Sequence, residues 1–186
     1  MFPDLDAPLP EGLPIPVDDG ACSHLLGLSL PSLSLPATTG RLVNLGALSG
    51  RVVIYCYPMT AQPGHALPAA WNEIPGARGC TPQSCAFRDH YRELGALGAA
   101  VYGLSTQDTE YQQEAVARLH LPYPLLRDAQ RAFAKALDLP LFEVDGMILL
   151  KRVTLIIEDG KIRKVFYPVF PPDRNAEDVL EWLRRH

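Results

Sequence analysis

Two cysteines lie five residues apart in the stretch GARGCTPQSCAF, residues 76–87, where a helix is expected to begin. A thiol at a helix N-terminus is close to unpaired backbone N–H groups and to the positive end of the helix dipole, and both favour the nucleophilic thiolate. Cys80 is therefore a candidate reactive thiol, with Cys85 as its partner. Arg78, Arg88 and Arg152 are candidate sources of further positive charge, because a guanidinium keeps its proton, and the sequence does not rank them.

The positions of the two thiols on a helix predict a conformational change. On a helical wheel Phe87 and Leu94 fall within about 40° of Cys80, whereas Cys85 lies about 140° away. Cys80 then heads the apolar stripe that faces the sheet. In an intact helix the two Cα atoms are roughly 8.6 Å apart, beyond the ~7 Å limit for a disulfide. Joining them requires the first turns to unwind, and Pro82 weakens those turns.

Other roles for cysteine are weaker. An isolated cysteine is usually a buried, inert apolar residue, and Cys56, inside an apolar strand, fits that description. Cys22 lies in or near a proline-rich stretch and is expected to be exposed. A zinc site needs four ligands, usually in paired short spacings, and no second pair accompanies Cys80 and Cys85, so no metal is predicted. Any disulfide should be transient, since a reducing cytosol disfavours permanent bridges.

The elements that must position the thiols follow a β-α-β-α order. RVVIYCYP, residues 51–58, is a nearly continuous apolar run and predicts a strand buried on both faces. Residues 99–106 predict a second buried strand and 124–128 a short edge strand. Helices are predicted over 81–97, 109–121 and 130–139, with Gly98 ending the first.

The two ends of the chain complete the predicted fold. Residues 27–45 read as an opening hairpin, and Asp159-Gly160 marks a second hairpin between alternating runs. A last helix is predicted after Asn175 as its N-cap. Residues 1–26 are rich in proline and are expected to form a flexible tail. The sum is an α/β sandwich of the thioredoxin-like class, with a mixed central sheet and helices on both faces.

Length and charge limit the classes of function. The 186 residues suit one domain, and the formal charge of −4 with scattered basic residues argues against a nucleic-acid partner. The first twenty residues lack the basic and apolar regions of a signal peptide, and no window approaches the roughly 18 apolar residues of a membrane span. We therefore expect a cytoplasmic protein with no membrane association.

The motifs together resemble the peroxiredoxins, most closely the Q-type class, also called bacterioferritin comigratory proteins. The resemblance rests on a strand ending in Tyr-Pro, on Gly-Cys-Thr-Pro-Gln-Ser-Cys-Ala-Phe-Arg-Asp, on Gly-Leu-Ser-Thr and on Lys-Arg-Val-Thr-Leu-Ile-Ile. It runs from about Gly27 to the C-terminus, so the domain is expected at 27–186. It implies a thioredoxin-like fold with an added N-terminal hairpin.

The resemblance also implies roles for single residues. Cys80 matches the peroxidatic cysteine, which attacks a peroxide and becomes a sulfenic acid. Cys85 matches the resolving cysteine, which forms an intramolecular disulfide with Cys80. Arg152 matches the strand arginine that holds the thiolate and polarises the peroxide. The implied substrates are hydrogen peroxide and organic hydroperoxides, with thioredoxin or a similar dithiol protein as reductant, no metal or organic cofactor, and a monomer or weak dimer.

One stretch departs from the family pattern. The family carries a threonine three residues before the peroxidatic cysteine, whereas here that position is Ala77, and Pro58 and Thr60 lie about twenty residues upstream of Cys80. Residues 61–76 therefore read as an insertion, which forms a lid, a docking surface around Trp71, or a surface embellishment. If it loops out, Thr60 can still offer its hydroxyl to the peroxide.

Two other functions share the same cysteines. A thioredoxin-like disulfide oxidoreductase is the first, although it expects Cys-x-x-Cys and a proline where this chain has Lys151-Arg152 before Val153. The second is a redox sensor or chaperone-like binding protein whose helix unwinds on oxidation and exposes apolar surface. The sequence leaves both open beside the peroxidase.

Overall fold

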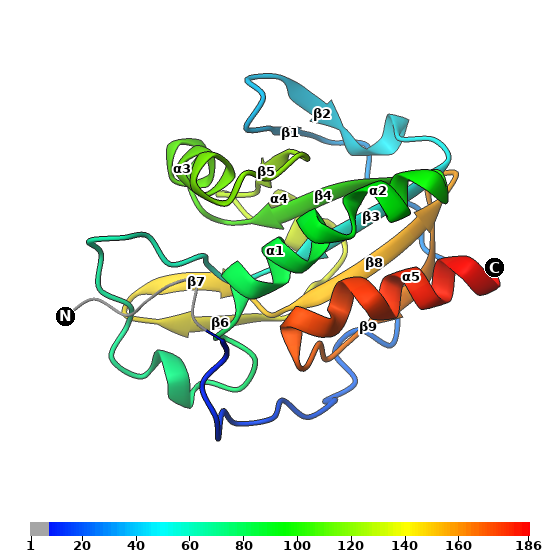
Figure 1. The fold of residues 1–186 in the computed structure, drawn as a ribbon. Helices are drawn as coiled ribbons and strands as arrows, with labels where there is room; N and C mark the ends of the chain where they lie inside the picture. Colours follow the sequence, from blue (N-terminus) through cyan, green and yellow to red (C-terminus); the bar gives the residue numbers. More distant parts are fainter. Residues whose placement is uncertain (1–7) are drawn as a thin grey trace.

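A five-stranded mixed sheet forms the centre of the computed structural model, which describes residues 8–186 (Figure 1). The strand order is β5-β4-β3-β8-β9; β3 pairs in parallel with β4 and β4 with β5, whereas β8 and β9 run antiparallel to their neighbours. The strands are β3 (Arg51–Cys56), β4 (Ala99–Ser105), β5 (Leu125–Arg127), β8 (Val153–Glu158) and β9 (Lys161–Phe166). The predicted thioredoxin-like fold class is confirmed.

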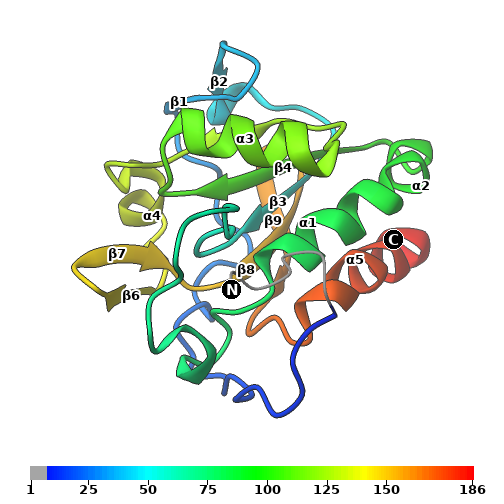
Figure 2. The ribbon, with the colours of Figure 1, turned by 60° about the vertical axis from the view of Figure 1, so that its left-hand side comes forward.

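Helices cover both faces of this sheet (Figure 2). Four pack on one face and contribute to one apolar cluster, and the short α4 packs on the other face. The helices are α1 (Cys80–Asp89), α2 (Tyr91–Ala96), α3 (Thr109–Leu119), α4 (Ala132–Ala136) and α5 (Asn175–Arg185). The predicted helix over 81–97 is thus two helices, because the backbone leaves the helical region at His90 (φ −96°, ψ 7°). Gly98, with φ 76°, follows the second one.

The apolar stripe predicted for α1 and α2 lies against the sheet. Cys80, Phe87 and Leu94 are all at most 3% exposed and belong to one cluster with Tyr55 of β3. The ring of Tyr55 stacks on that of Phe87 with centroids 4.6 Å apart. Burial of these side chains fixes which side of the helix faces the core, and therefore where Cys80 points.

Within residues 8–186 the chain forms three hairpins, one of which, β8–β9, belongs to the central sheet. The opening one pairs β1 (Ser34–Pro36) with β2 (Leu42–Asn44), close to the predicted position, followed by a short 3₁₀ helix, η1 (Leu45–Ala47). Asp159 and Gly160, both at positive φ, turn β8 into β9 as predicted. A third hairpin, β6 (Leu141–Val144) with β7 (Met147–Leu150), was not predicted.

The packed domain begins before residue 27. Cys22 is 5% exposed and Leu25 is fully buried, and both belong to the apolar cluster under the second face of the sheet. Asp19 accepts hydrogen bonds from Lys151 (2.9 Å) and from the hydroxyl of Tyr167 (2.8 Å). The prediction of an unpacked tail over 1–26 and of an exposed Cys22 is therefore wrong for residues 19–26, because two apolar side chains and one carboxylate in this proline-rich stretch find partners in the domain. Residues 1–7 of that tail lie outside the described residues.

The insertion at 61–76 packs against the β6–β7 hairpin. Trp71, in the short 3₁₀ helix η2 (Trp71–Glu73), is 3% exposed and lies in a small apolar cluster with Val144 and Leu149. Its ring centroid is 6.2 Å from that of Phe142. The insertion and the β6–β7 hairpin, for which the sequence predicted no contact, thus share a small apolar core that also contains Ala77.

Along residues 8–186, none of the helices has both the length and the apolar character that crossing a bilayer demands.

Candidate active site

Cys80 is the first residue of α1 and is almost fully buried. The residue before it, Gly79, has φ 111°, a conformation that favours glycine. A Cβ at this position would lie 2.3 Å from Cγ of Pro172, in the 3₁₀ helix η3 (Pro172–Arg174). The glycine therefore allows the start of α1 to pack closely against the start of α5. This packing places Cys80 at the helix N-terminus that the sequence predicted.

Arg152 is the arginine that contacts Cys80. Its Nη2 lies 3.1 Å from Sγ of Cys80, and the side chain is buried. Arg88, in contrast, donates to the backbone oxygen of Leu119 and pairs with Asp89. Arg152 follows β7 and immediately precedes β8, which is paired with β3, so a residue 72 positions after Cys80 in sequence reaches the start of α1.

Backbone oxygens and one amide fix the Arg152 guanidinium. It donates to the oxygens of Gly76 (3.3 Å) and Ala77 (3.0 Å), and a short hydrogen bond joins it to Oε1 of Gln83. These partners are neutral, so the positive charge of the guanidinium is left for the sulfur. A fixed charge at this distance stabilises a thiolate and any negative charge that develops on an attached oxygen.

Gln83 connects this site to the sheet and to α5. Its Nε2 donates to Oδ1 of Asn175 (3.0 Å), which also accepts from the hydroxyl of Thr154 (2.7 Å). Asn175 was predicted as an N-cap, and this is wrong: it is the first residue of α5, Arg174 precedes it, and no side chain caps the helix. Its amide is used by the buried polar network instead. Gln83 and Asn175 were not predicted as site residues; the Thr154 hydroxyl on a buried strand was the available signal.

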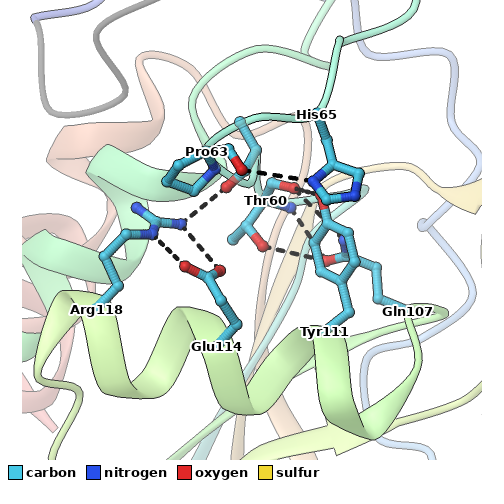
Figure 3. Close-up of polar contacts among 8 residues, drawn as sticks. Thr60, Pro63, His65, Gln107, Tyr111, Glu114 and Arg118 are labelled. Atoms are coloured by element: carbon cyan, nitrogen blue, oxygen red, sulfur yellow. Dashed lines mark hydrogen bonds and ion pairs between the residues drawn. The ribbon is translucent and has the colours of Figure 1, made fainter.

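Thr60 lies near the site but its hydroxyl points to another residue (Figure 3). The side chain is 1% exposed, and Oγ1 and the backbone N–H both donate to Oε1 of Gln107, at 3.3 and 3.1 Å. The hydroxyl of Tyr111, on α3, donates to the Thr60 backbone oxygen (3.0 Å). Thr60 is therefore held by the segment around α3, and among the hydrogen bonds of residues 8–186 none joins Thr60 to Cys80.

A small cavity covers Cys80. Its volume is about 20 Å³, enough for a molecule of about the size of water or a peroxide group. Met59 and Ala61 line it on either side of Thr60, and Trp71 and Leu67 of the insertion form part of its wall. The insertion thus helps to close the space above the thiol. The complete lining comprises Leu9, Met59, Ala61, Leu67, Trp71, Arg78, Gly79, Cys80, Thr81 and Pro82.

Cys85 lies further along α1 and is half-buried. It lines a larger groove of about 560 Å³ together with Arg88, Arg118 and Glu177. No disulfide joins it to Cys80, as expected for two positions on one intact helix. The structure brings Cys80 and Arg152 together, and leaves Cys85 and Thr60 with other neighbours.

The two remaining cysteines lie below the other face of the sheet. Burial raises the pKa of the Cys22 thiol to about 12, with Asp19 and Asp18 contributing in the same direction. Burial also raises the pKa of Cys56, and the charge of Asp128 adds to this. Both stay protonated and unreactive at neutral pH. Across the described part of the chain, no group of three or more histidine, cysteine or acidic side chains is arranged to hold a metal ion.

Known proteins share this architecture. A family model described as Redoxin matches residues 25–180. Peroxiredoxin Q, chloroplastic, from Suaeda salsa is 28% identical over 155 residues, 83% of this chain and 65% of that protein. The protein of the same name from Oryza sativa subsp. japonica is 28% identical over 85% of this chain and 66% of its own length. The chain therefore spans slightly less than two thirds of these relatives.

Solved structures agree with the fold. Peroxidoxin BcpB from Mycobacterium tuberculosis superposes with a TM-score of 0.69 at 28% identity, covering 86% of this chain and 96% of that one. A PrxQ mutant from Xylella fastidiosa gives a TM-score of 0.71 at 21% identity, covering 87% and 96%, and supports the fold alone. The resemblance to the Q-type peroxiredoxins is thereby confirmed, and the chain belongs to the redoxin family.

Proposed function

We propose that this chain is a thiol peroxidase that reduces hydrogen peroxide and organic hydroperoxides. The observation that carries the proposal is the contact of 3.1 Å between Nη2 of Arg152 and Sγ of Cys80, at a helix N-terminus beneath a cavity that fits a peroxide group. The names of the relatives and neighbours point the same way.

The first step is a nucleophilic displacement at oxygen. The Cys80 thiolate attacks one peroxide oxygen, the O–O bond breaks, and the second oxygen leaves as water or an alcohol after taking up a proton. The cysteine is oxidised by two electrons to a sulfenic acid. Arg152 stabilises the thiolate and the negative charge on the leaving oxygen, and its bonds to Ala77 and Gln83 hold it in place as that charge develops.

The second step closes a disulfide. The Cys85 thiol attacks the Cys80 sulfenic acid, an S–S bond forms, and water leaves. Both residues lie on α1, so the helix must unwind between them. A dithiol protein of the thioredoxin type then supplies the two electrons and two protons that restore the thiols.

The role of Thr60 stays a prediction. For its hydroxyl to reach a peroxide above Cys80, it must turn away from Oε1 of Gln107. A Thr60→Val variant that loses peroxide reactivity while keeping its fold would support the role; unchanged reactivity would assign Thr60 to the contact with Gln107 alone.

The contact of Arg152 with Cys80 argues against the first alternative, a disulfide oxidoreductase. A disulfide oxidoreductase of the thioredoxin type carries a proline where this chain has Arg152, and here that residue contacts the thiol.

We further propose that the protein works as a monomer or weak dimer in the cytoplasm, where a thioredoxin system can reduce it. Sedimentation and cell fractionation test these two points.

The decisive experiment measures peroxide consumption with a thioredoxin system, together with intact mass after one equivalent of peroxide. We expect turnover and a loss of two hydrogens in the wild type. In Cys85→Ser we expect instead the Cys80 sulfenic acid, which is seen as a gain of one oxygen in mass and can be trapped by a sulfenic acid reagent. Turnover that survives Cys80→Ser, or insulin reduction without peroxide consumption, would reject the peroxidase.

A further inference from the structure

Three hydroxyl-bearing side chains meet beneath the part of α1 that separates the two cysteines. Ser84, directly before Cys85, is fully buried, and its Oγ lies 3.0 Å from the hydroxyl of Tyr55. The Tyr55 and Tyr123 hydroxyls are 2.9 Å apart. The Tyr123 hydroxyl donates to the backbone oxygen of Ser84 at 2.7 Å. Tyr55 belongs to β3, whereas Tyr123 lies just before β5, so the sheet holds this residue of the helix from two places.

The proton count makes the arrangement a closed ring. Each hydroxyl has one proton to donate. Tyr123 gives its proton to the Ser84 backbone oxygen, so the bond between the two tyrosines takes the proton of Tyr55. Ser84 must then donate to Tyr55. Each of the three hydroxyls donates one hydrogen bond, and the two tyrosine hydroxyls and the Ser84 carbonyl each accept one. Hydrogen bonds linked in this way polarise and strengthen one another. Burial raises the pKa of both tyrosines, so the protons are retained at physiological pH.

We propose that Tyr123 and Tyr55 are positioning residues that set the rate at which α1 opens, and hence the rate of disulfide formation. This inference rests on the proposed peroxidase function. Unwinding between Cys80 and Cys85 moves the Ser84 backbone, and the ring must then break. The peroxide step needs an intact helix, since Cys80 meets Arg152 there, and does not require the ring to open. The ring therefore affects the second step and leaves the first unchanged.

The ring also determines how often the thiol is lost to further oxidation. The Cys80 sulfenic acid either condenses with Cys85, releasing water, or reacts with a second peroxide, which inserts another oxygen to give the sulfinic acid and releases water or an alcohol. A helix that opens slowly gives the second peroxide more time. Loosening the ring shifts this competition toward the disulfide.

The test variant is Tyr123→Phe, which removes one hydroxyl and keeps the aromatic side chain that packs beside Tyr91. Ser84 lies inside α1, where a backbone carbonyl also accepts the helical hydrogen bond from the residue four positions on, so the Ser84 carbonyl keeps a partner in this variant. Of the two hydrogen bonds that Tyr123→Phe removes, the one to the Ser84 backbone must break when α1 opens, and one neutral hydrogen bond corresponds to roughly a two- to tenfold change in an equilibrium. We expect disulfide formation, followed by rapid acid quench, thiol alkylation and intact mass, to be about fivefold faster. The rate constant for the reaction of Cys80 with peroxide should stay at the wild-type value.

The matched control is Tyr102→Phe, on β4, whose partly buried side chain packs against the other face of the sheet. Both rates should match the wild type in this control. In Tyr123→Phe, the sulfinic acid formed at high peroxide, seen as a gain of two oxygens, should fall about fivefold. Hydrogen exchange of residues 80–89 in the reduced protein should be faster in Tyr123→Phe than in the control.

Several results would overturn the inference. Disulfide formation at the wild-type rate in Tyr123→Phe would do so, as would equal slowing of both steps. If Tyr123→Phe does not fold, Tyr55→Phe, which breaks the bond to Ser84 Oγ and the bond between the two tyrosines, must show the faster disulfide step. If neither variant folds, the ring serves the stability of the whole domain and the inference fails. A wild type that forms no disulfide after peroxide would instead reject the proposed function.

Discussion

Cys80 and Cys56 are both buried thiols that lie against opposite faces of the same sheet, and the charged groups that act on the two sulfurs have opposite signs. Cys80 is 3% exposed and contacts the Arg152 guanidinium. Cys56 is fully buried in apolar packing, and the charge with the largest effect on it is the carboxylate of Asp128. Burial alone disfavours a thiolate at both positions. The Arg152 cation, together with the cavity above the sulfur, therefore makes Cys80 rather than Cys56 the candidate nucleophile.

Replacing each thiol in turn should produce the largest contrast. Cys80→Ser should lower peroxide turnover by roughly a thousandfold or more, because a serine hydroxyl is a far weaker nucleophile than a thiolate. Cys22→Ala and Cys56→Ala should keep turnover near the wild-type value, since neither thiol reaches the cavity. Peroxide consumption with a thioredoxin system measures this, and comparable losses in all three variants would remove the distinction between the two faces.

At pH 8, Cys22 should be alkylated about a thousandfold more slowly than an ordinary thiol. Its pKa is raised to about 12, mainly by burial, so pH 8 lies about four units below it and only about one thiol in ten thousand is ionised. Because the pKa is raised, reactivity should climb about tenfold per pH unit and level off only near pH 12. Iodoacetamide labelling followed by peptide mass tests this, with unfolded protein as reference; rapid labelling of the folded protein at pH 8 would contradict it.

Removing the cation should make Cys80 resemble Cys56. Arg152→Met takes away a charged hydrogen bond worth about 1.5–3 kcal/mol and should slow the reaction with peroxide by about a hundredfold. Arg88→Met is the matched control, because Arg88 bonds to Leu119 and Asp89, and its rate should stay near the wild type. Stopped-flow measurement of the peroxide step gives both values. An equal rate in the two variants would exclude Arg152 as the residue that activates the thiol.

The smallest expected effect comes from the polar network that holds the cation. Asn175→Ala leaves the Gln83 amide and the Thr154 hydroxyl without their shared partner, which should cost about 1–3 kcal/mol in the free energy of unfolding and slow the peroxide step a few-fold. The exposed Asn72 offers a control substitution to alanine. Urea unfolding together with the stopped-flow rate checks both parts; unchanged stability would mean that Asn175 contributes no net hydrogen bonding.

Local patterns were sufficient for most of the fold. A few residues close in sequence are enough to predict each of three features: the apolar run of β3, the Asp159-Gly160 turn, and the stripe through Phe87 and Leu94. All three predictions were correct. The β6–β7 hairpin carries the same signal, Asp145-Gly146 at φ 48° and 75°, and was overlooked because its second strand runs almost directly into β8.

The site was predicted less completely, because its members come together through the sheet. The residue pattern alone left three arginines unranked and the family resemblance pointed to Arg152; the pairing of β8 with β3 explains how Arg152 reaches Cys80. For Gln83 and Asn175 the one local signal is the Thr154 hydroxyl on a buried strand, and the hydroxyl ring under Ser84 joins residues from three separate segments. Thr60 and the insertion show the opposite difficulty: the sequence indicated their importance, while packing against Gln107 and against the β6–β7 hairpin decides where they lie.

Residues close along the chain are enough to place two cysteines at the start of a helix and to give the order of strands and helices, since these features depend on periodicity, capping and turn residues. The three-dimensional packing sets which charge meets Cys80, what holds Ser84, and that residues 19–26 join the domain. Those choices depend on contacts between segments tens of residues apart, where a hydrogen bond or a buried side chain is stable only after the sheet has brought its partner within reach.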